Sequence, residues 1–217
     1  MIVVIQCAAS KKPGAGHLRR RDGRRVLFVA DPDGAPEVSG CFYARPDDMA
    51  DTGHSWRHQL RRYNDTTGDN SLGLLPAWQL YRNPTYEVLA ECYGLDRLYI
   101  LSAGWGLLAA EFLTPNYDIT FSAQADRYKR RRKGDRYDDI SMLPEDTDEP
   151  VVLLVSKDYV RLACDLTERI RSQKYLFFNS ATIPDAPGCN LKRYKTTTRT
   201  NWQYECAYAL IEGRVGV

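Results

Sequence analysis

LYILSAGWGLLAAEFLTPNYDITFS, residues 98–122, is the stretch of this 217-residue chain around which the rest is organised. Its first four residues form a short apolar and aromatic run, which predicts a buried central strand. The run gives way to Ser102-Ala103-Gly104 and then to Trp105, and these small residues permit a tight loop and the close approach of a ligand. Open α/β sheets bind ligands at the carboxyl edge of their strands. We therefore expect this loop to lie at a binding site.

The same stretch contains a proline-stiffened turn, TPNYD, at residues 114–118. The turn presents an amide, an aromatic ring and a carboxylate side by side, in Asn116, Tyr117 and Asp118. This combination is typical of the floor of a pocket. The same residues also fit an Asx turn beside a core tyrosine, and the sequence leaves both interpretations open.

Length and composition predict one globular domain over residues 1–217. The chain is 43% hydrophobic and 27% charged, as soluble domains are, and no apolar run approaches the length of a membrane span. The amino terminus turns polar by Ser10 without a basic lead, so we expect a first strand, no signal peptide and a cytoplasmic protein. The six cysteines lack a C-x-x-C pair and matched histidines. We therefore expect free thiols and no metal site. We also expect no cofactor, and a monomer.

Apolar runs alternate with helical periodicity along the chain. We expect strands at residues 1–6, 98–101, 151–155 and 174–178, a hairpin at 19–40 and an edge strand at 188–194. We expect two helices within 72–94, and helices at 122–133, 160–172 and 201–213. This alternation predicts an α/β fold, a single three-layer domain with a central, mostly parallel sheet flanked by helices. Loops 7–12, 102–105 and 179–182 would then meet at one edge of the sheet, with Asp118 nearby.

Basic residues are concentrated in three groups, although the net charge is only +2. Such runs are often no more than solvated surface. Three of them, interleaved with tyrosine and tryptophan, favour contacts with phosphates and stacking on bases. The candidate DNA-contacting residues are Arg19, Arg20, Arg130, Arg131, Arg132, Lys133, Lys192, Arg193, Lys195 and Arg199.

The loop after the first strand, CAASKKPGAGH at residues 7–17, combines small residues with two lysines. Backbone N–H groups and ammonium groups in such a loop can hold an anion. The G-x-x-x-x-G-K spacing of a P-loop is absent, so we do not expect nucleoside triphosphate binding.

Residues 151–170, VVLLVSKDYVRLACDLTERI, and 174–182, KYLFFNSAT, resemble segments of the uracil-DNA glycosylase superfamily. By this resemblance Asn179 and Ser180 stand in the place of the family's catalytic histidine loop. Ser102 stands where the family has a base-reading asparagine, and residues 7–12 where it has a water-activating acidic loop. The Gly-Gln-Asp-Pro-Tyr-His motif and the His-Pro-Ser loop are absent, so we expect a base other than uracil.

The loop at residues 7–17, together with YDI at 117–119, also looks like the lysine-transferring module of archaeosine synthase, which acts on a deazaguanine base in tRNA. Here Lys12-Pro13-Gly14 departs from that family's Lys-Pro-Tyr. The short basic chain further resembles bacterial glycosylase-like defence proteins, which excise hypermodified bases such as glucosylated hydroxymethylcytosine from phage DNA.

These resemblances imply a DNA glycosylase that flips a modified base out of phage DNA and hydrolyses its N-glycosidic bond, as antiviral defence. Base flipping needs phosphate contacts and a snug pocket. Asp118 is the candidate that stabilises the positively charged sugar, while Lys11 and Asn179 would stabilise the departing base. Further substrate contacts are expected from Cys7, Ser10, Ser102, Gly104, Trp105, Asn116, Tyr117 and Ser180.

Three alternatives stay open at this point. Lys11 or Lys12 can instead attack the sugar as a Schiff-base nucleophile. The chain can be a non-catalytic module that recognises modified nucleic acid. It can also be a transferase acting on a deazaguanine base in tRNA.

Overall fold

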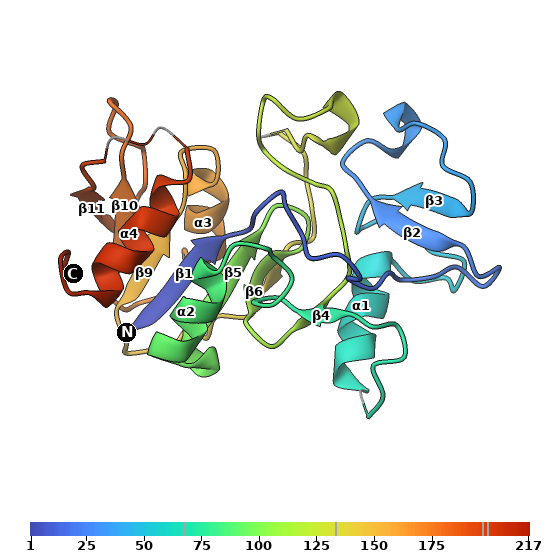
Figure 1. Cartoon of the computed structure of the whole chain (residues 1–217), viewed down its shortest axis with the longest axis horizontal. Coiled ribbons are helices and arrows are strands. Elements are labelled where there is room, and N and C mark those ends of the chain that lie inside the picture. Colours follow the sequence, from blue (N-terminus) through green and yellow to red (C-terminus); the bar gives the residue numbers. More distant parts are fainter. Residues whose placement is uncertain (67, 133, 197, 199) are drawn as a thin grey trace.

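A seven-stranded sheet in the order β11-β10-β9-β1-β5-β6-β8 forms the centre of the molecule (Figure 1). It is seen in a computed structural model, which describes residues 1–66, 68–132, 134–196, 198 and 200–217. The strands are β1 (Ile2–Gln6), β5 (Leu98–Ser102), β6 (Gly106–Ala109), β8 (Ile140–Ser141), β9 (Val151–Leu154), β10 (Lys174–Phe178) and β11 (Cys189–Arg193).

The three central strands are buried along their whole length, which is why their sequences are apolar at every position except the ends. Every residue of β1, β5 and β9 is buried. Parallel strands covered on both faces have this continuous apolar pattern. β1 pairs in parallel with β5 and with β9, and the parallel arrangement continues through β10 to β11. β6 runs antiparallel to β5 and carries β8 in parallel beside it.

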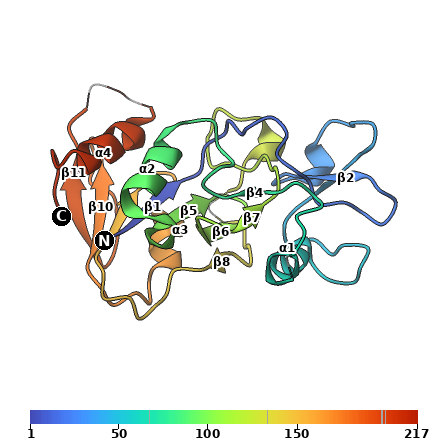
Figure 2. The ribbon, with the colours of Figure 1, turned by 60° about the horizontal axis from the view of Figure 1, so that its bottom comes forward.

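Helices cover both faces of the sheet. α2 (Thr85–Tyr93) and α4 (Trp202–Ile211) lie on one face, and α3 (Val160–Leu166) lies on the other (Figure 2). The predicted α/β class, with a mostly parallel sheet and flanking helices, is confirmed. In the described part of the chain, no helix is both long and apolar enough to cross a membrane.

The strand order creates a switch point beside β1. From β1 the chain goes to β5 on one side, and it later returns to β9 on the other side and continues outward to β10 and β11. Loops that leave two neighbouring parallel strands in opposite directions open a crevice at their carboxyl ends. The fold therefore places a crevice after Gln6 and after Leu154.

A lobe adjoins the far end of the sheet, on the right in Figure 1. It contains β2 (Arg25–Phe28), β3 (Cys41–Ala44) and α1 (Trp56–Asp65), and the short pair β4 (Leu75–Pro76) and β7 (Leu113–Thr114) lies beside it. Phe28 packs edge-on against Trp56, at 6.1 Å between ring centroids, and against Trp105, at 4.9 Å. Buried residues of the lobe and of the sheet thus belong to one hydrophobic cluster.

Four predicted elements differ from the structure. The expected hairpin at residues 19–40 is wrong, because β2 pairs with β3 in parallel. The expected helix at 122–133 is reduced to a 3-10 turn at Arg127–Lys129, since Arg131 turns inward instead of following a helical surface. Within 72–94 only the second helix forms, and α3 ends at Leu166, six residues before the predicted end at 172.

Candidate active site

A cleft of about 940 Å³ opens at the carboxyl ends of β1, β9 and β10. We call it the polar cleft, because Lys157 and Asp158 are the only charged residues among its described lining residues. Hydroxyl and amide side chains dominate the lining, including those of Ser122, Ser156, Asn179, Ser180, Thr196 and Gln203. The candidate residues Cys7, Asn179 and Ser180 are brought together here, as the strand-end argument predicts.

A smaller pocket of about 330 Å³ adjoins the polar cleft at Ala9, which lines both. We call it the lysine pocket. It collects four of the candidate residues, Lys11, Asn116, Tyr117 and Asp118, and it is walled by the rings of His17, Tyr43 and Tyr128. Tyr43 and Tyr128 are half-buried and stand edge-to-face at 6.3 Å. Aromatic walls of this kind offer stacking surfaces to a planar ligand.

Lys11 is the unusual group in the lysine pocket. Its ammonium lies over the ring of Tyr117, 4.2 Å from the centroid, and no hydrogen bond or ion pair of this ammonium occurs among the described residues. Burial lowers the pKa of Lys11, and the nearby charge of Lys129 lowers it further, whereas Cys7 and Asp118 oppose the shift. The amine therefore loses its proton more readily than an ordinary lysine does.

Lys12, the next residue, lies in a different environment. Its ammonium forms an ion pair with Glu87 at 2.7 Å, and both side chains are substantially exposed. Lys12 lines neither the lysine pocket nor the polar cleft. The two neighbouring lysines are thus distinguished by structure, although the sequence alone left them equivalent as nucleophiles.

Asp118 stands at the rim of the lysine pocket. Its side chain is 49% exposed and forms an ion pair with Lys129 at 3.0 Å, and Lys129 also pairs with Asp126 at 2.8 Å. The hydrogen bonds that Lys129 donates to the carboxylates of Asp126 and Asp118 raise the pKa of Lys129. The backbone N–H of Asp118 donates to the carbonyl of Phe28. The carboxylate is therefore held in place and remains accessible to solvent.

A network of buried hydroxyl groups supports the floor of the lysine pocket. The Tyr117 hydroxyl is 2.9 Å from that of Tyr81 and accepts a hydrogen bond from Ser102, also at 2.9 Å. Beside it, the Cys7 thiol lies 3.3 Å from the hydroxyl of Tyr159. Burial raises the pKa of Tyr81, Tyr117 and Tyr159. These tyrosines therefore stay protonated at neutral pH, and the floor of the pocket is held by hydrogen bonds between uncharged groups.

Three candidate substrate contacts lie beneath the floor and must be corrected. Ser102 and Trp105 are completely buried, and the Ser102 hydroxyl accepts the N–H groups of residues 104 and 105. A Cβ added at Gly104 would lie 3.2 Å from the side chains of Tyr117 and Ile119, so a larger residue here would press on the ring of Tyr117. The loop after β5 therefore supports the pocket and does not touch a ligand. Ser10, also a candidate, is exposed and lines neither cavity.

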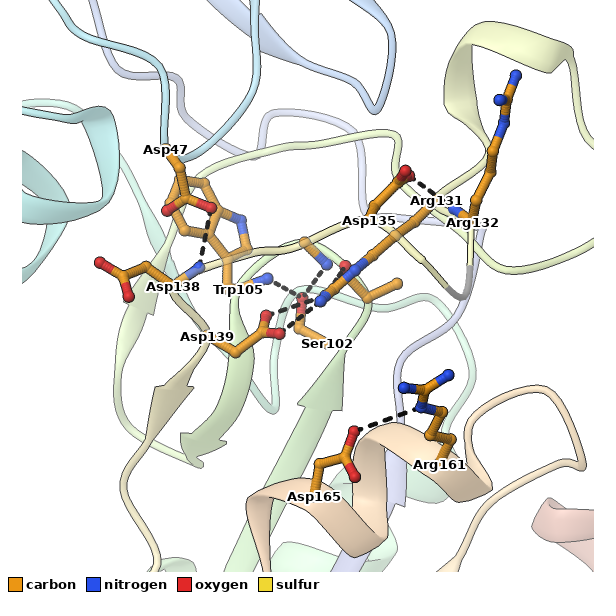
Figure 3. A network of polar contacts seen from close by, with 12 residues as sticks. Asp47, Ser102, Trp105, Arg131, Arg132, Asp135, Asp138, Asp139, Arg161 and Asp165 are labelled. Atoms are coloured by element: carbon orange, nitrogen blue, oxygen red, sulfur yellow. Dashed lines mark hydrogen bonds and ion pairs between the residues drawn. The ribbon is translucent and has the colours of Figure 1, made fainter.

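Two buried arginines hold the carbonyls of this loop from opposite sides. Arg131 donates to the carbonyl of Ala103 at 2.9 Å and is gripped by both oxygens of Asp139, as Figure 3 shows. Arg57 donates to the carbonyls of residues 104 and 105, at 3.0 and 2.9 Å, and is held by Asp47. We call the two arginines the arginine clamp. Because the side chain of Arg131 is only 6% exposed, its predicted role in DNA contact is wrong.

The other basic candidates do not form one patch. Arg127, Arg130 and Arg132 line a hollow of about 280 Å³ that shares Ala123 and Asp158 with the polar cleft. The turn that carries Arg19 and Arg20 precedes β2, whereas Lys192 and Arg193 belong to β11, and β2 and β11 lie at opposite ends of the molecule (Figures 1 and 2).

The remaining basic candidates do not extend a DNA-contacting surface. Arg193 donates to the carbonyl of Ser180 at 2.7 Å and so braces a wall of the polar cleft. Lys195 is exposed. Lys133 and Arg199 lie outside the described residues.

Three residues at the site were not predicted from the sequence: Gln6 and Gln203, which line the polar cleft, and Tyr43, which walls the lysine pocket. Tyr128, the other aromatic wall, is one of the tyrosines interleaved with the basic runs that were expected to offer stacking surfaces. Gln6 ends an apolar strand at the switch point, which is the signal that could have revealed it. Gln203 and Tyr43 carry no signal, because only the tertiary fold brings them to the cavities. No group of three or more His, Cys, Asp or Glu within the described ranges is placed to hold a metal ion.

Comparison of the chain with family models, with curated proteins and with solved structures finds no match.

Proposed function

We propose that the protein is a DNA glycosylase with a uracil-DNA glycosylase-like fold, which flips out a modified base and hydrolyses its N-glycosidic bond. The base would carry a bulky polar substituent, as glucosylated hydroxymethylcytosine in phage DNA does, and its removal would serve antiviral defence. One observation carries the proposal. Lys11 and Asp118 line a single aromatic-walled pocket, and that pocket opens beside a large, mostly uncharged polar cleft.

The chemistry of the polar cleft supports a neutral, hydroxyl-rich substituent. Its volume of about 940 Å³ is ample for a base together with a sugar substituent. Hydroxyl and amide side chains hydrogen-bond sugar hydroxyls, and the aromatic rings of Trp202 and Tyr204 in the lining offer an apolar surface for a sugar face. A phosphate ligand would instead call for arginine and lysine. Those residues gather in the neighbouring hollow formed by Arg127, Arg130 and Arg132.

The lysine pocket supplies charges of both signs for glycosyl cleavage. As the C1′–N bond breaks, the sugar becomes positive, and the accessible carboxylate of Asp118 would stabilise it and orient a water molecule. The water oxygen bonds to C1′, its proton leaves, and the base departs with the bonding electron pair and takes up a proton. Donors near the base, the Lys11 ammonium and the Asn179 amide, would reduce the cost of its negative charge.

A second mechanism is favoured by the environment of Lys11. A neutral amine is a nucleophile, and the lowered pKa of Lys11 makes the neutral form more abundant. Its lone pair would attack C1′, the base would leave with the bonding pair, and opening of the sugar ring would give an iminium ion. Water then releases the aldehyde and restores the amine, or elimination of the 3′ phosphate nicks the strand. Lys12 is the weaker candidate for this role, because its ammonium is paired with Glu87 and it lines neither cavity.

The decisive experiment is mass spectrometry of small molecules released from unmodified and glucosylated hydroxymethylcytosine DNA by the purified protein. We expect free modified base and abasic sites, and at least a 100-fold slower release with Asp118→Asn. Asp126→Asn is the matched control, because Asp126 shares Lys129 with Asp118 but lines neither cavity. No release from any DNA would refute the enzyme, and tight binding without release would favour a recognition module.

Borohydride separates the two mechanisms. Reduction during turnover would join the DNA covalently to Lys11 if the amine attacks the sugar, and Lys11→Met would abolish the adduct. Lys12→Met changes the neighbouring, ion-paired lysine and should leave the adduct in place. Base release without any trapped adduct would assign the reaction to Asp118 and water.

A further inference from the structure

Two glutamine side chains in the polar cleft have hydrogen-bonding groups that the protein itself leaves unused. Gln6 is 9% exposed and Gln203 is 4% exposed, and both line the cleft. Neither side chain has an atom among the fully buried polar atoms that lack a partner, so their unpaired groups reach the space of the cleft. Amides that are kept unpaired at a cavity wall are suited to a ligand.

The amide of Gln6 has a defined orientation. Its oxygen Oε1 accepts the backbone N–H of Ser156 at 2.6 Å, which fixes which end of the amide carries the nitrogen. No partner of the nitrogen Nε2 occurs among the described residues. Gln6 therefore offers two N–H donors, while its Oε1 is already engaged by Ser156. It can recognise a group that accepts hydrogen bonds.

Gln203 approaches the same region from α4. No hydrogen bond of its side chain occurs within the described part of the chain, so both its oxygen and its nitrogen are available. Its neighbour Tyr204 lies 3.3 Å, hydroxyl to hydroxyl, from Tyr86, and the Tyr86 hydroxyl donates to the backbone carbonyl of Gln6 at 2.8 Å. This bridge ties the first turn of α4 to the end of β1. The bridge runs through the buried Tyr86 and the half-buried Tyr204, and it holds the chain segments that carry the two glutamines beside one another.

We propose that Gln6 and Gln203 read the hydrogen-bonding edge of the flipped base. The inference rests on the proposed function and deepens it, because it names the part of the substrate that the cleft recognises. Gln6 contributes two donors and therefore selects an acceptor on the base, a carbonyl oxygen or an unprotonated ring nitrogen. Gln203 contributes a donor and an acceptor, so it can complete a pattern that includes an amino group.

Side-chain NMR tests the proposal without requiring catalysis. The chain has six glutamines, so protein labelled with ¹⁵N-glutamine gives few amide signals, and Gln6→Glu and Gln203→Leu assign the two of interest. Cytidine, uridine and guanosine are titrated separately from glucose. We expect one or more nucleosides, but not glucose, to shift both amide signals. A shift with glucose alone, or with none of these probes, would overturn the base-reading role.

Base release provides a second readout. We expect Gln6→Glu, which replaces donors by an acceptor of the same shape, to lower kcat/KM about 10- to 100-fold. Gln173→Glu is the control for the added charge, because Gln173 is exposed and directly precedes β10, outside both cavities. Normal release by both Gln6→Glu and Gln203→Leu would also overturn the proposal. If the wild-type protein releases no base, the proposed glycosylase activity is refuted, but the base-reading role is still decided by the NMR titration.

Discussion

Loss of Arg131 should destabilise the protein far more than loss of an arginine in an exposed ion pair. The side chains of Arg131 and Asp139 are 6% and 8% exposed, and Arg131 makes two hydrogen bonds to Asp139 and one to the carbonyl of Ala103. Arg131→Met leaves a buried carboxylate and a buried carbonyl without partners. Breaking a buried ion pair in this way costs about 3–5 kcal/mol. For a chain of this size that corresponds to a fall in Tm of roughly 6–20 °C.

Arg161→Met is the matched control. Arg161 pairs with Asp165 at 3.8 Å one helical turn away on α3, and their side chains are 69% and 65% exposed (Figure 3). An exposed pair of this kind contributes about 0.3–0.5 kcal/mol, so its Tm should fall by no more than about 2 °C.

Thermal unfolding followed by circular dichroism, with reversibility checked, measures both variants. The double variant Arg131→Met/Asp139→Leu removes the orphaned charge and should recover much of the loss. Equal Tm values for Arg131→Met and Arg161→Met, or a double variant no better than the single one, would refute the reasoning.

Three further outcomes follow from the site. Burial lowers the pKa of Lys11 from 10.5, so the protonated side chain lowers the stability of the folded protein at neutral pH. Lys11→Met should therefore raise Tm at pH 7. Differential scanning fluorimetry should show that this gain in Tm vanishes as the pH approaches about 10.5. If Arg127 and Arg130 contact phosphates, replacing both by alanine should reduce the salt slope of log K for DNA by about 2; an unchanged slope would remove them from the interface. The contact with Cys164 lowers the pKa of Cys189, so iodoacetamide should label Cys189 faster than Cys164 at pH 7, and Cys164→Ala should slow the labelling of Cys189.

The sheet was predictable because its strands are coded locally. The runs that begin at Ile2, Leu98, Val151 and Lys174 are apolar and bounded by polar or small residues, and burial on both faces demands that pattern. The convergence of Cys7 and Asn179 followed from parallel strands, whose carboxyl ends share one edge. The last helix, α4, begins directly after Asn201, close to the start predicted at residue 201.

The wrong predictions concern segments in which tertiary contacts override the preference of the local sequence. Arg131 lies in a run of basic residues that indicates a solvated surface, yet Asp139 and the carbonyl of Ala103 draw it into the interior. Trp105 follows small residues in a loop, which suggests exposure, but the lobe covers it through Phe28. β2 and β3 are separated by a turn signal that suits a hairpin, although the chain crosses over and pairs them in parallel. Asp139 is eight residues from Arg131, and the other partners are farther away, so none of these contacts shows in the local pattern.

The arginine clamp also makes the candidate active site depend on segments that are far apart along the chain. Arg57 meets the loop after β5 from 47 and 48 residues earlier in the chain, and Arg131 meets it from 28 residues later. Asp118 lies within the segment that Arg131 closes onto Ala103. Because Arg57 is carried by α1 in the lobe, the clamp couples the floor of the lysine pocket to the packing of the lobe, and local opening of either segment would disturb both.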